Sequence, residues 1–187
     1  MTDEDLFRRT MRQVASGVFV ITTSLDDRLH ATTATAFLPL SAAPPMVLVC
    51  LHRDGDTHRA LTQTTRFGVN VLAEHQASLS ARFAGKTSDR YRFDDLPRFS
   101  GPNGVTFLRG CAAHIEVETT ATADGGDHTI FIGRVTWTQV DTDAAPLVYH
   151  RRAYHRLAPL GGAAPGADTN DFCRDLTRAA RGGHIKQ

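Results

Sequence analysis

The spacing of hydrophobic residues changes from a helical period to a strand period near residue 17. Over residues 3–15, Leu6, Phe7, Met11 and Val14 recur at helical spacing. Acidic residues precede them and arginines follow, an order that suits the helix dipole. The pattern predicts a helix over 3–15 that ends at Gly17, a residue common after helix ends.

From residue 18 onward, short β-branched and aromatic runs predict strands separated by polar turns. Asp26-Asp27 predicts one turn, and Asp124-Gly125-Gly126-Asp127 predicts a hairpin. Short helices are expected around Leu61 and over 76–83, and a long polar loop over 84–104. Strands are expected at 18–23, 30–37, 46–51, 66–72, 112–121, 128–140, 147–150 and 153–157. Six or seven such strands in one sheet, with few helices, predict a mainly β barrel with peripheral helices.

The composition changes after residue 157. Residues 158–166 are glycine, alanine and proline in large part, which indicates a linker. Residues 169–181 have the spacing of a short helix. We therefore expect one domain over 1–157, followed by a linker and tail over 158–187.

Composition excludes several classes of function. The 187-residue chain has a formal net charge of +1, so nothing in it indicates a nucleic-acid partner. It contains no apolar run long enough to span a membrane, and its three dispersed cysteines fit a reducing cytoplasm better than a disulfide framework. It also lacks the GxGxxG, GxxxxGK[ST], HExxH and GxSxG patterns of dinucleotide-binding, P-loop, zinc-protease and hydrolase sites.

Two stretches could hold a flat, phosphorylated ligand. In Thr32–Phe37, small side chains would allow a planar ligand close to the backbone, although tapering barrel strands also need small residues. Arg53–Arg59 indicates a loop entering a helix, with Asp56 or Thr57 as N-cap and His58 adding positive charge beside a phosphate. The alternative for this loop is a capped surface turn with solvated arginines.

Two further residues are candidates for ligand binding, and each also has an ordinary structural explanation. Lys86, after a glycine at a predicted helix end, could reach a phosphate or simply complement the helix dipole. His128 follows the predicted hairpin, where Asp127 could orient it over a pocket mouth, or it is a half-exposed strand residue. The remaining histidines show no metal-ligand spacing, so we predict no metal site.

In order along the chain, these stretches resemble the flavin reductase-like, FMN-binding split-barrel family. The similarity runs from about Phe7 to about Leu157. It includes the opening FRRTMRQVASGVFVITT, the Ser41 and Pro44–Leu51 segment, Thr57-His58, Phe67–Leu72, Arg82–Ala84, Gly126-Asp127-His128, Gly133, Pro146–Tyr149 and Tyr154. The resemblance implies a split β-barrel of Greek-key type that pairs as a homodimer.

The resemblance also implies the site residues. None is expected to be a catalytic nucleophile or acid, because the cofactors carry hydride transfer. The nicotinamide nucleotide is expected at His128, and Tyr154 at that nucleotide or the flavin ring. Flavin contacts are expected from Thr33, Ala34, Thr35, Ala36, Phe37, Cys50, Leu51, Asp56, Thr57, His58, Phe83, Ala84 and Lys86.

By this resemblance the chain is an NAD(P)H:flavin oxidoreductase. It would use NADH or NADPH to reduce FMN or FAD, and would supply reduced flavin to a partner monooxygenase. Where the family usually has Asn and Ser, this chain has Thr35 and Ala36, so an exchangeable flavin is expected. The alternatives are a non-catalytic flavin-binding protein, or a pyridoxamine-phosphate oxidase-like or haem-processing split-barrel protein.

Overall fold

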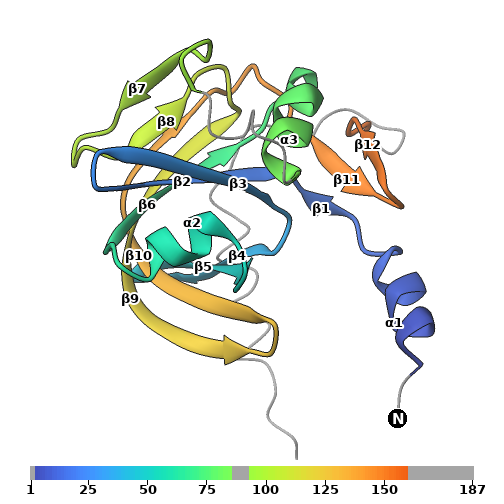
Figure 1. Cartoon of the computed structure of the whole chain (residues 1–187). Coiled ribbons are helices and arrows are strands. Elements are labelled where there is room, and N and C mark those ends of the chain that lie inside the picture. The colour runs from blue at the N-terminus through green and yellow to red at the C-terminus, as the bar shows by residue number, and fades with distance from the viewer. Residues whose placement is uncertain (1–2, 86–92, 160–187) are drawn as a thin grey trace, which may run out of the picture. The chain divides into compact units, whose positions relative to one another are not determined.

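The computed structural model describes residues 3–85 and 93–159, and the chain divides into two units between Leu157 and Ala158. The first unit is mainly β, as predicted, and its centre is a seven-stranded antiparallel sheet that curls into a barrel (Figure 1). In spatial order the strands are β3 (Arg28–Ala34), β2 (Phe19–Leu25), β6 (Arg66–Val71), β9 (Ala113–Gly125), β10 (His128–Val140), β5 (Pro45–His52) and β4 (Phe37–Ala42).

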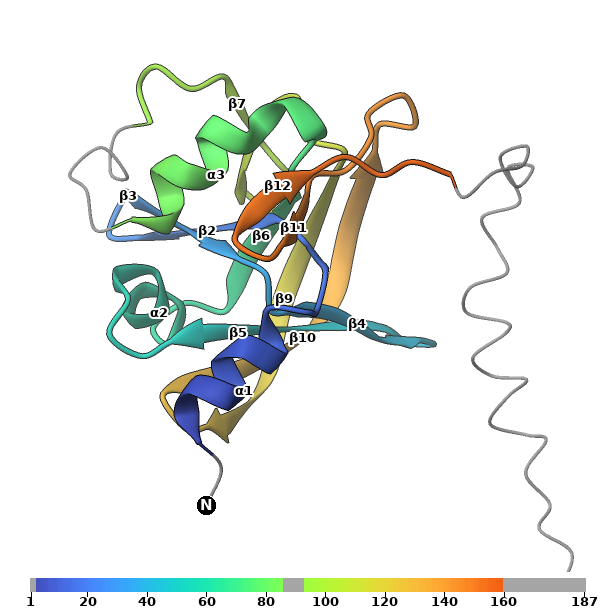
Figure 2. The same ribbon diagram turned by 90° about the vertical axis from the view of Figure 1, so that its right-hand side faces the viewer.

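Smaller elements surround this barrel. Strands β1 (Ser16–Gly17), β11 (Val148–His150) and β12 (Ala153–His155) form a second sheet, and β7 (Arg98–Ser100) pairs with β8 (Thr106–Leu108). The helices are α1 (Glu4–Met11), α2 (Asp56–Leu61) and α3 (Ala77–Ala84), with a 3₁₀ turn η1 (Glu74–Gln76) before α3. Figure 2 shows α3 beside β11 and β12, with α2 on the other side of β3. None of the helices in the described parts of the chain has the length and apolar character needed to cross a membrane.

Strand β2 is buried on both faces, which gives the molecule two apolar cores. Neighbouring residues of a strand point to opposite faces, so Ile21 packs inside the barrel while Val20 packs outside it. The inner core includes Phe67 and Phe131, and the outer core includes Phe83 of α3. Burial on both faces of β2 therefore explains why its sequence is a continuous β-branched and aromatic run rather than an alternating one.

The hairpin predictions are confirmed. Asp26 and Asp27 both have positive φ (49° and 59°), as a tight two-residue turn between β2 and β3 requires. Gly126 (φ 77°) turns the chain between β9 and β10. Strand β10 has the predicted bounds, β9 extends further than predicted, and their hairpin reaches beyond the barrel body (Figure 1).

Several predicted boundaries were wrong. The first helix ends at Met11, and Gly17 lies in β1 instead of ending that helix. The expected strand 30–37 is two strands, because the chain leaves β3 after Ala34 and begins β4 at Phe37. The expected loop 84–104 contains β7. The predicted helix 169–181 lies outside the described residues.

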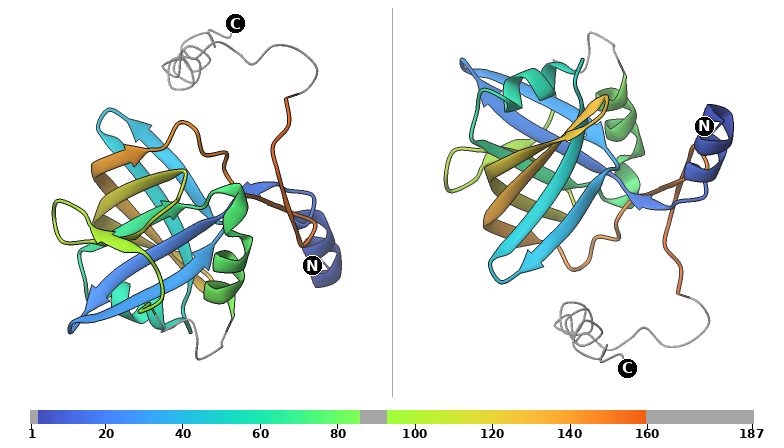
Figure 3. Two further views of the ribbon diagram at one scale, coloured as in Figure 1. Left: turned by 90° about the horizontal axis from the view of Figure 1, so that it is seen from above. Right: turned by 90° about the horizontal axis from the view of Figure 1, so that it is seen from below.

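The barrel is left open on one side. Strands β3 and β4 end the sheet, although only residues 35–36 separate them in sequence. At the rim of the opening, the Cys50 N–H of β5 donates a hydrogen bond to the Ala36 carbonyl (2.9 Å), which continues the β4–β5 pairing by one residue. Figure 3 shows the curled sheet from both ends, with α1 standing to one side. The opening places the free edge of β3 opposite the end of β5.

Candidate functional site

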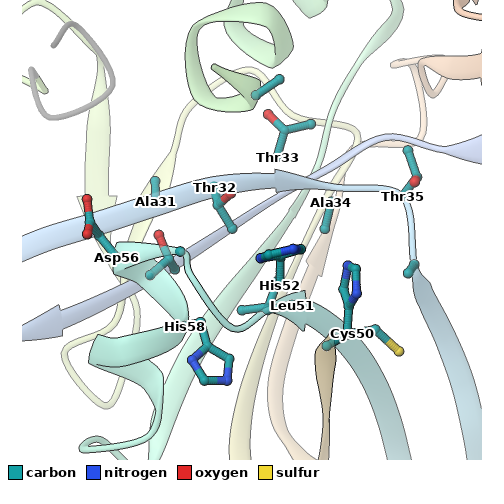
Figure 4. Close-up of a pocket in the computed structure, with 15 residues that line it drawn as sticks. Ala31, Thr32, Thr33, Ala34, Thr35, Cys50, Leu51, His52, Asp56 and His58 are labelled. Atoms are coloured by element: carbon teal, nitrogen blue, oxygen red, sulfur yellow. The ribbon is translucent and has the colours of Figure 1, made fainter. Parts of the chain in front are cut away.

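A cavity of about 310 Å³ occupies the opening between β3 and β5. Figure 4 shows Thr32 and Ala34 on β3 facing Leu51 and His52 on β5, with Asp56 and His58 of α2 at one end. Its lining residues are Ala31, Thr32, Thr33, Ala34, Thr35, Ala36, Cys50, Leu51, His52, Gly55, Asp56, Thr57, His58, Ala84 and His128.

The β3 wall is made of small side chains on an edge strand. Ala31 and Ala34 point to opposite faces of the strand yet both line the cavity, so the cavity faces the strand's edge. An edge strand directs some of its backbone N–H and C=O groups away from its neighbour, where a ligand can bind them. The Thr33 hydroxyl donates to the Ser80 carbonyl of α3 (2.7 Å), so it helps to fix this wall.

Cys50 on β5 is suited to packing rather than to redox chemistry. Partial burial raises the pKa of its thiol, so the thiolate is disfavoured at neutral pH. The backbone of the same residue donates to Ala36 and holds the two sides of the cavity together.

The loop before α2 is less cationic than predicted. Gly55, not Asp56 or Thr57, is the N-cap. Arg59 forms an ion pair with Asp56, and Arg53 pairs with Asp124 (3.1 Å). Burial, followed by the nearby charges of Arg53 and two histidines, lowers the pKa of His58, so this ring is neutral at pH 7.

His58 instead connects α2 to β10. Its Nε2 lies 2.8 Å from the Thr129 hydroxyl, and its ring packs edge-on against Phe131. Its Nδ1 is buried without a hydrogen-bond partner among the described residues. A buried polar atom without a partner is uncommon in a folded protein, and a ligand in the cavity would supply one.

His128 is oriented as the sequence suggested. Its Nδ1 lies 2.7 Å from a carboxylate oxygen of Asp127, and that hydrogen bond is the main cause of a lowered pKa at Asp127. His128 pairs in register with His52 across β10 and β5, and their ring centroids are 5.1 Å apart.

The structure brings most of the predicted site residues together, and three lie elsewhere. Phe83 is 1% exposed and stacks on Phe93 in the outer core. Phe37 packs against Phe19, and the Tyr154 hydroxyl donates to the Ser80 hydroxyl (2.9 Å) beside α3. Contacts of these three with a cofactor stay predictions, and Lys86 lies outside the described residues.

Four lining residues were not predicted as cofactor contacts: Ala31, Thr32, Gly55 and His52, although Thr32 and Gly55 lie in the two stretches predicted to hold a ligand. The first two continue the small-residue run on β3, so that run was the signal for them. Gly55 belongs to the loop already singled out. His52 ends an apolar strand, and only the pairing of β5 with β10 reveals its position beside His128.

Comparison with known protein families assigns the chain to one of them. Residues 11–158 match the flavin reductase like domain. The chain belongs to this family. Among its relatives is the reductase component of an FADH(2)-dependent resorcinol hydroxylase of Rhizobium sp. (strain MTP-10005), 38% identical over 160 residues that cover 84% of this chain and 89% of the relative. A flavin reductase (NADH) of Kitasatospora aureofaciens is also 38% identical, and 83% of each chain is covered.

Solved structures of the family show the same fold. An NADH:FAD oxidoreductase of Streptomyces globisporus, in complex with NAD and FAD fragments, superposes with a TM-score of 0.79. It is 30% identical, and the match covers 86% of this chain and 96% of that one. Flavin reductase PheA2 in its native state has a TM-score of 0.77 at 34% identity, covering 84% of this chain and all of that one.

The cavity fits a flavin of the kind that the family uses. Its volume lies within the range of small-ligand sites, about 300–1,000 Å³. Small side chains on β3 leave room for a flat ring, and the edge of that strand offers backbone hydrogen bonds. The unpartnered Nδ1 of His58 provides a polar contact at the α2 end.

Proposed function

We propose that this protein is an NADH-dependent flavin reductase that supplies reduced flavin to a separate monooxygenase. The observation that carries the proposal is the cavity at the open edge of the barrel, lined by the small residues of β3 and by His128, in a chain of the flavin reductase-like family. Relatives named as reductase components of resorcinol and 4-nitrophenol monooxygenases support the partner. Relatives named as NADH-dependent support the reductant.

A bound flavin supplies the redox chemistry by accepting a hydride from the nicotinamide. The residues of the chain then have three tasks. The edge of β3 and the end of β5 hold the flat ring, Thr33 and Cys50 keep those two walls in place, and His128 positions the nicotinamide nucleotide. Such a hydride transfer needs no nucleophile from the protein. The Cys50 thiol stays protonated because burial raises its pKa.

A matrix of cofactors tests the proposal. NADH and NADPH are each mixed with FMN, FAD or riboflavin, and oxidation of the nucleotide is followed by its absorbance. We expect rapid oxidation of NADH with at least one flavin. Binding of flavin without any oxidation of nucleotide would favour a non-catalytic flavin-binding protein instead.

A second variant tests the role of His128. His128→Ala should raise the KM for NADH several-fold and lower the flavin affinity by a smaller factor, because the residue lies at the mouth of the cavity. His75→Ala, at an exposed histidine outside this cavity, is the matched control. An unchanged KM for NADH in His128→Ala would show that the assigned role is wrong.

We also propose that the chain works as a homodimer in the cytoplasm and meets its oxygenase only transiently. Exposed apolar side chains support the dimer: Leu38 and Leu40 lie on the terminal strand β4, and Phe7 and Met11 lie on α1. Such side chains on an edge strand favour association with another chain. The two described cysteines are free, as expected in a reducing compartment.

A further inference from the structure

Two histidines stand side by side at the mouth of the cavity. His52 ends β5 and His128 begins β10, and the antiparallel register places them directly opposite each other. Their rings meet edge to face, with a 77° angle between the planes. Both line the cavity, and Figure 4 shows His52 between β3 and β5. The proposed function gives a role to His128 but none to His52.

A backbone contact fixes the proton of His52. The Asp54 N–H donates a hydrogen bond to Nδ1 of His52 (3.2 Å). Because a backbone amide can only donate, Nδ1 must accept, and the neutral ring then carries its proton on Nε2. The nearest carboxylate oxygen to this Nε2, on Asp127, is 3.9 Å away, too far for a hydrogen bond. His52 therefore presents an N–H donor that remains available.

The opposite arrangement holds for His128. The Asp127 carboxyl has a lowered pKa, so it is an ionised acceptor at neutral pH. The Nδ1 of His128 must therefore donate to it across the 2.7 Å contact, so the neutral form of the ring has its lone pair on Nε2. His128 thus presents an acceptor beside the donor of His52.

The charged and ionisable groups around this pair do not occupy its two ring nitrogens that face the ligand. The guanidinium of Arg53 is held by Asp124 and by the His128 carbonyl. The ring of His58 is neutral because burial lowers its pKa. The Asp54 carboxylate is 3.9 Å from the Nδ1 of His52, on the side opposite to its donor. A ligand at this pair therefore meets one N–H, from His52, and one lone pair, from His128.

We infer that His52 and His128 together bind an amide edge of the ligand, a carbonyl oxygen beside an N–H. The carbonyl accepts from Nε2–H of His52, and the N–H donates to Nε2 of His128. The inference rests on the proposed function, which supplies two ligands with such an edge: the carboxamide of the nicotinamide and the pyrimidine ring of the flavin. In either case His52 determines specificity without entering the chemistry.

Binding measurements with edited ligands test the inference. Calorimetry gives the Kd of NAD⁺ and of its 3-acetylpyridine analogue, which keeps the carbonyl and lacks the N–H, on flavin-saturated protein. A parallel arm compares FMN with 3-methyl-FMN, which lacks the flavin N–H. We expect the wild-type protein to bind the N–H-bearing member of one pair several-fold, up to about tenfold, more tightly. The arm that discriminates identifies the ligand.

Two variants distinguish the role of His52 from that of His128. His128→Phe should abolish the discrimination, because the acceptor is lost. His52→Phe should weaken both members of the pair by a similar factor, because both keep the carbonyl. His75→Phe, on η1 and outside this cavity, should change neither value. Thermal unfolding of every variant confirms that it is folded.

Three outcomes would overturn the inference: no discrimination in either arm of the wild type, discrimination that survives in His128→Phe, or unchanged affinities in His52→Phe. The result is independent of turnover. A protein that discriminates but does not oxidise NADH would contradict the proposed function alone, and the reverse result would contradict this inference alone.

Discussion

At the scale of single residues, Thr35 and Ala36 stand where the sequence resemblance leads us to expect asparagine and serine. Both are exposed, both line the cavity, and they form the link between β3 and β4. An asparagine and a serine at these positions would add a carboxamide and a hydroxyl within the cavity.

We predict that Thr35→Asn and Ala36→Ser each tighten flavin binding. A hydrogen bond gained at each position is worth about 0.5–1.5 kcal/mol, which corresponds to roughly 2- to 12-fold in Kd. Quenching of flavin fluorescence measures the affinity. Thr138→Asn, at an exposed threonine outside the cavity, is the control. An unchanged Kd in both variants would mean that these positions do not contact the flavin.

The histidines show what a sequence can reveal about single residues. His128 was predictable because a tight turn and an adjacent carboxylate are both local features. His58 was placed correctly in the cavity, but its charge was not, because the pKa depends on burial by distant strands. His52 carries no local signal, since its importance comes from pairing with a residue 76 positions later in the chain.

At the scale of elements, the long hairpin of β9 and β10 bends at Gly133. A register shift lies between Ile132 and Gly133, which marks a β-bulge. A Cβ at Gly133 would collide with the Val117 side chain and lie 2.8 Å from the Glu118 carbonyl oxygen. Backbone atoms of the neighbouring strand cannot move away without disturbing the sheet.

We predict that Gly133→Ala lowers the free energy of unfolding by about 2–3 kcal/mol, as overpacking does in a tight interior. Urea denaturation measures the change. Gly126→Asn is the matched control, because that turn residue has positive φ, which asparagine tolerates, and nothing within 4 Å of an added Cβ. Equal stability of wild type and Gly133→Ala would show that the strands can separate at the bulge.

The terminal strand β4 provides the test of the proposed dimer. Leu38 is 60% exposed and Leu40 is 49% exposed, although both are apolar. We predict that the double variant Leu38→Lys, Leu40→Lys shifts the protein from dimer to monomer in sedimentation velocity, because charges are costly to bury in an interface. Its melting temperature at low concentration should change little. A wild-type monomer at micromolar concentration would rule out the dimer.

Strand types were more predictable than strand ends. Alternating or continuous apolar runs identified most of the central sheet, because burial imposes these patterns directly. The break after Ala34 was invisible, since Thr35 and Ala36 are compatible with a continuous strand. The short strand β1 depends on a partner distant in sequence, β11, so no local pattern predicts it. Strands β7 and β8 pair with each other nearby in the chain, but three residues each are too few to show a period.

At the scale of the whole molecule, buried histidines make stability depend on pH. Burial is the largest cause of a lowered pKa at His30, His58 and His114. Between their folded values and the unfolded value of about 6.5, the unfolded chain binds more protons than the folded chain. Stability therefore rises with pH in this window, and it is lost as the pH falls below about 6.5.

We predict that the free energy of unfolding decreases between pH 7.5 and pH 5.5, and that His114→Gln flattens this decrease. His114 is suited to the test because it is only 6% exposed and its Nε2 lies 2.7 Å from the Leu108 carbonyl. The exposed carboxylates Asp124 and Asp127 also have lowered pKa values, but they lose their contribution only below about pH 4. Stability that stays constant over the window would contradict the prediction.

The opening between β3 and β5 has a consequence for how the protein responds to its ligand. Strands β3 and β5 are not hydrogen-bonded neighbours in the sheet, so a ligand bonded to both would bridge the opening between them. A bound flavin should therefore stabilise the barrel, and the melting temperature should rise with flavin concentration as mass action requires. On this basis the folded protein is most stable with flavin bound, and its stability falls each time reduced flavin leaves for the oxygenase.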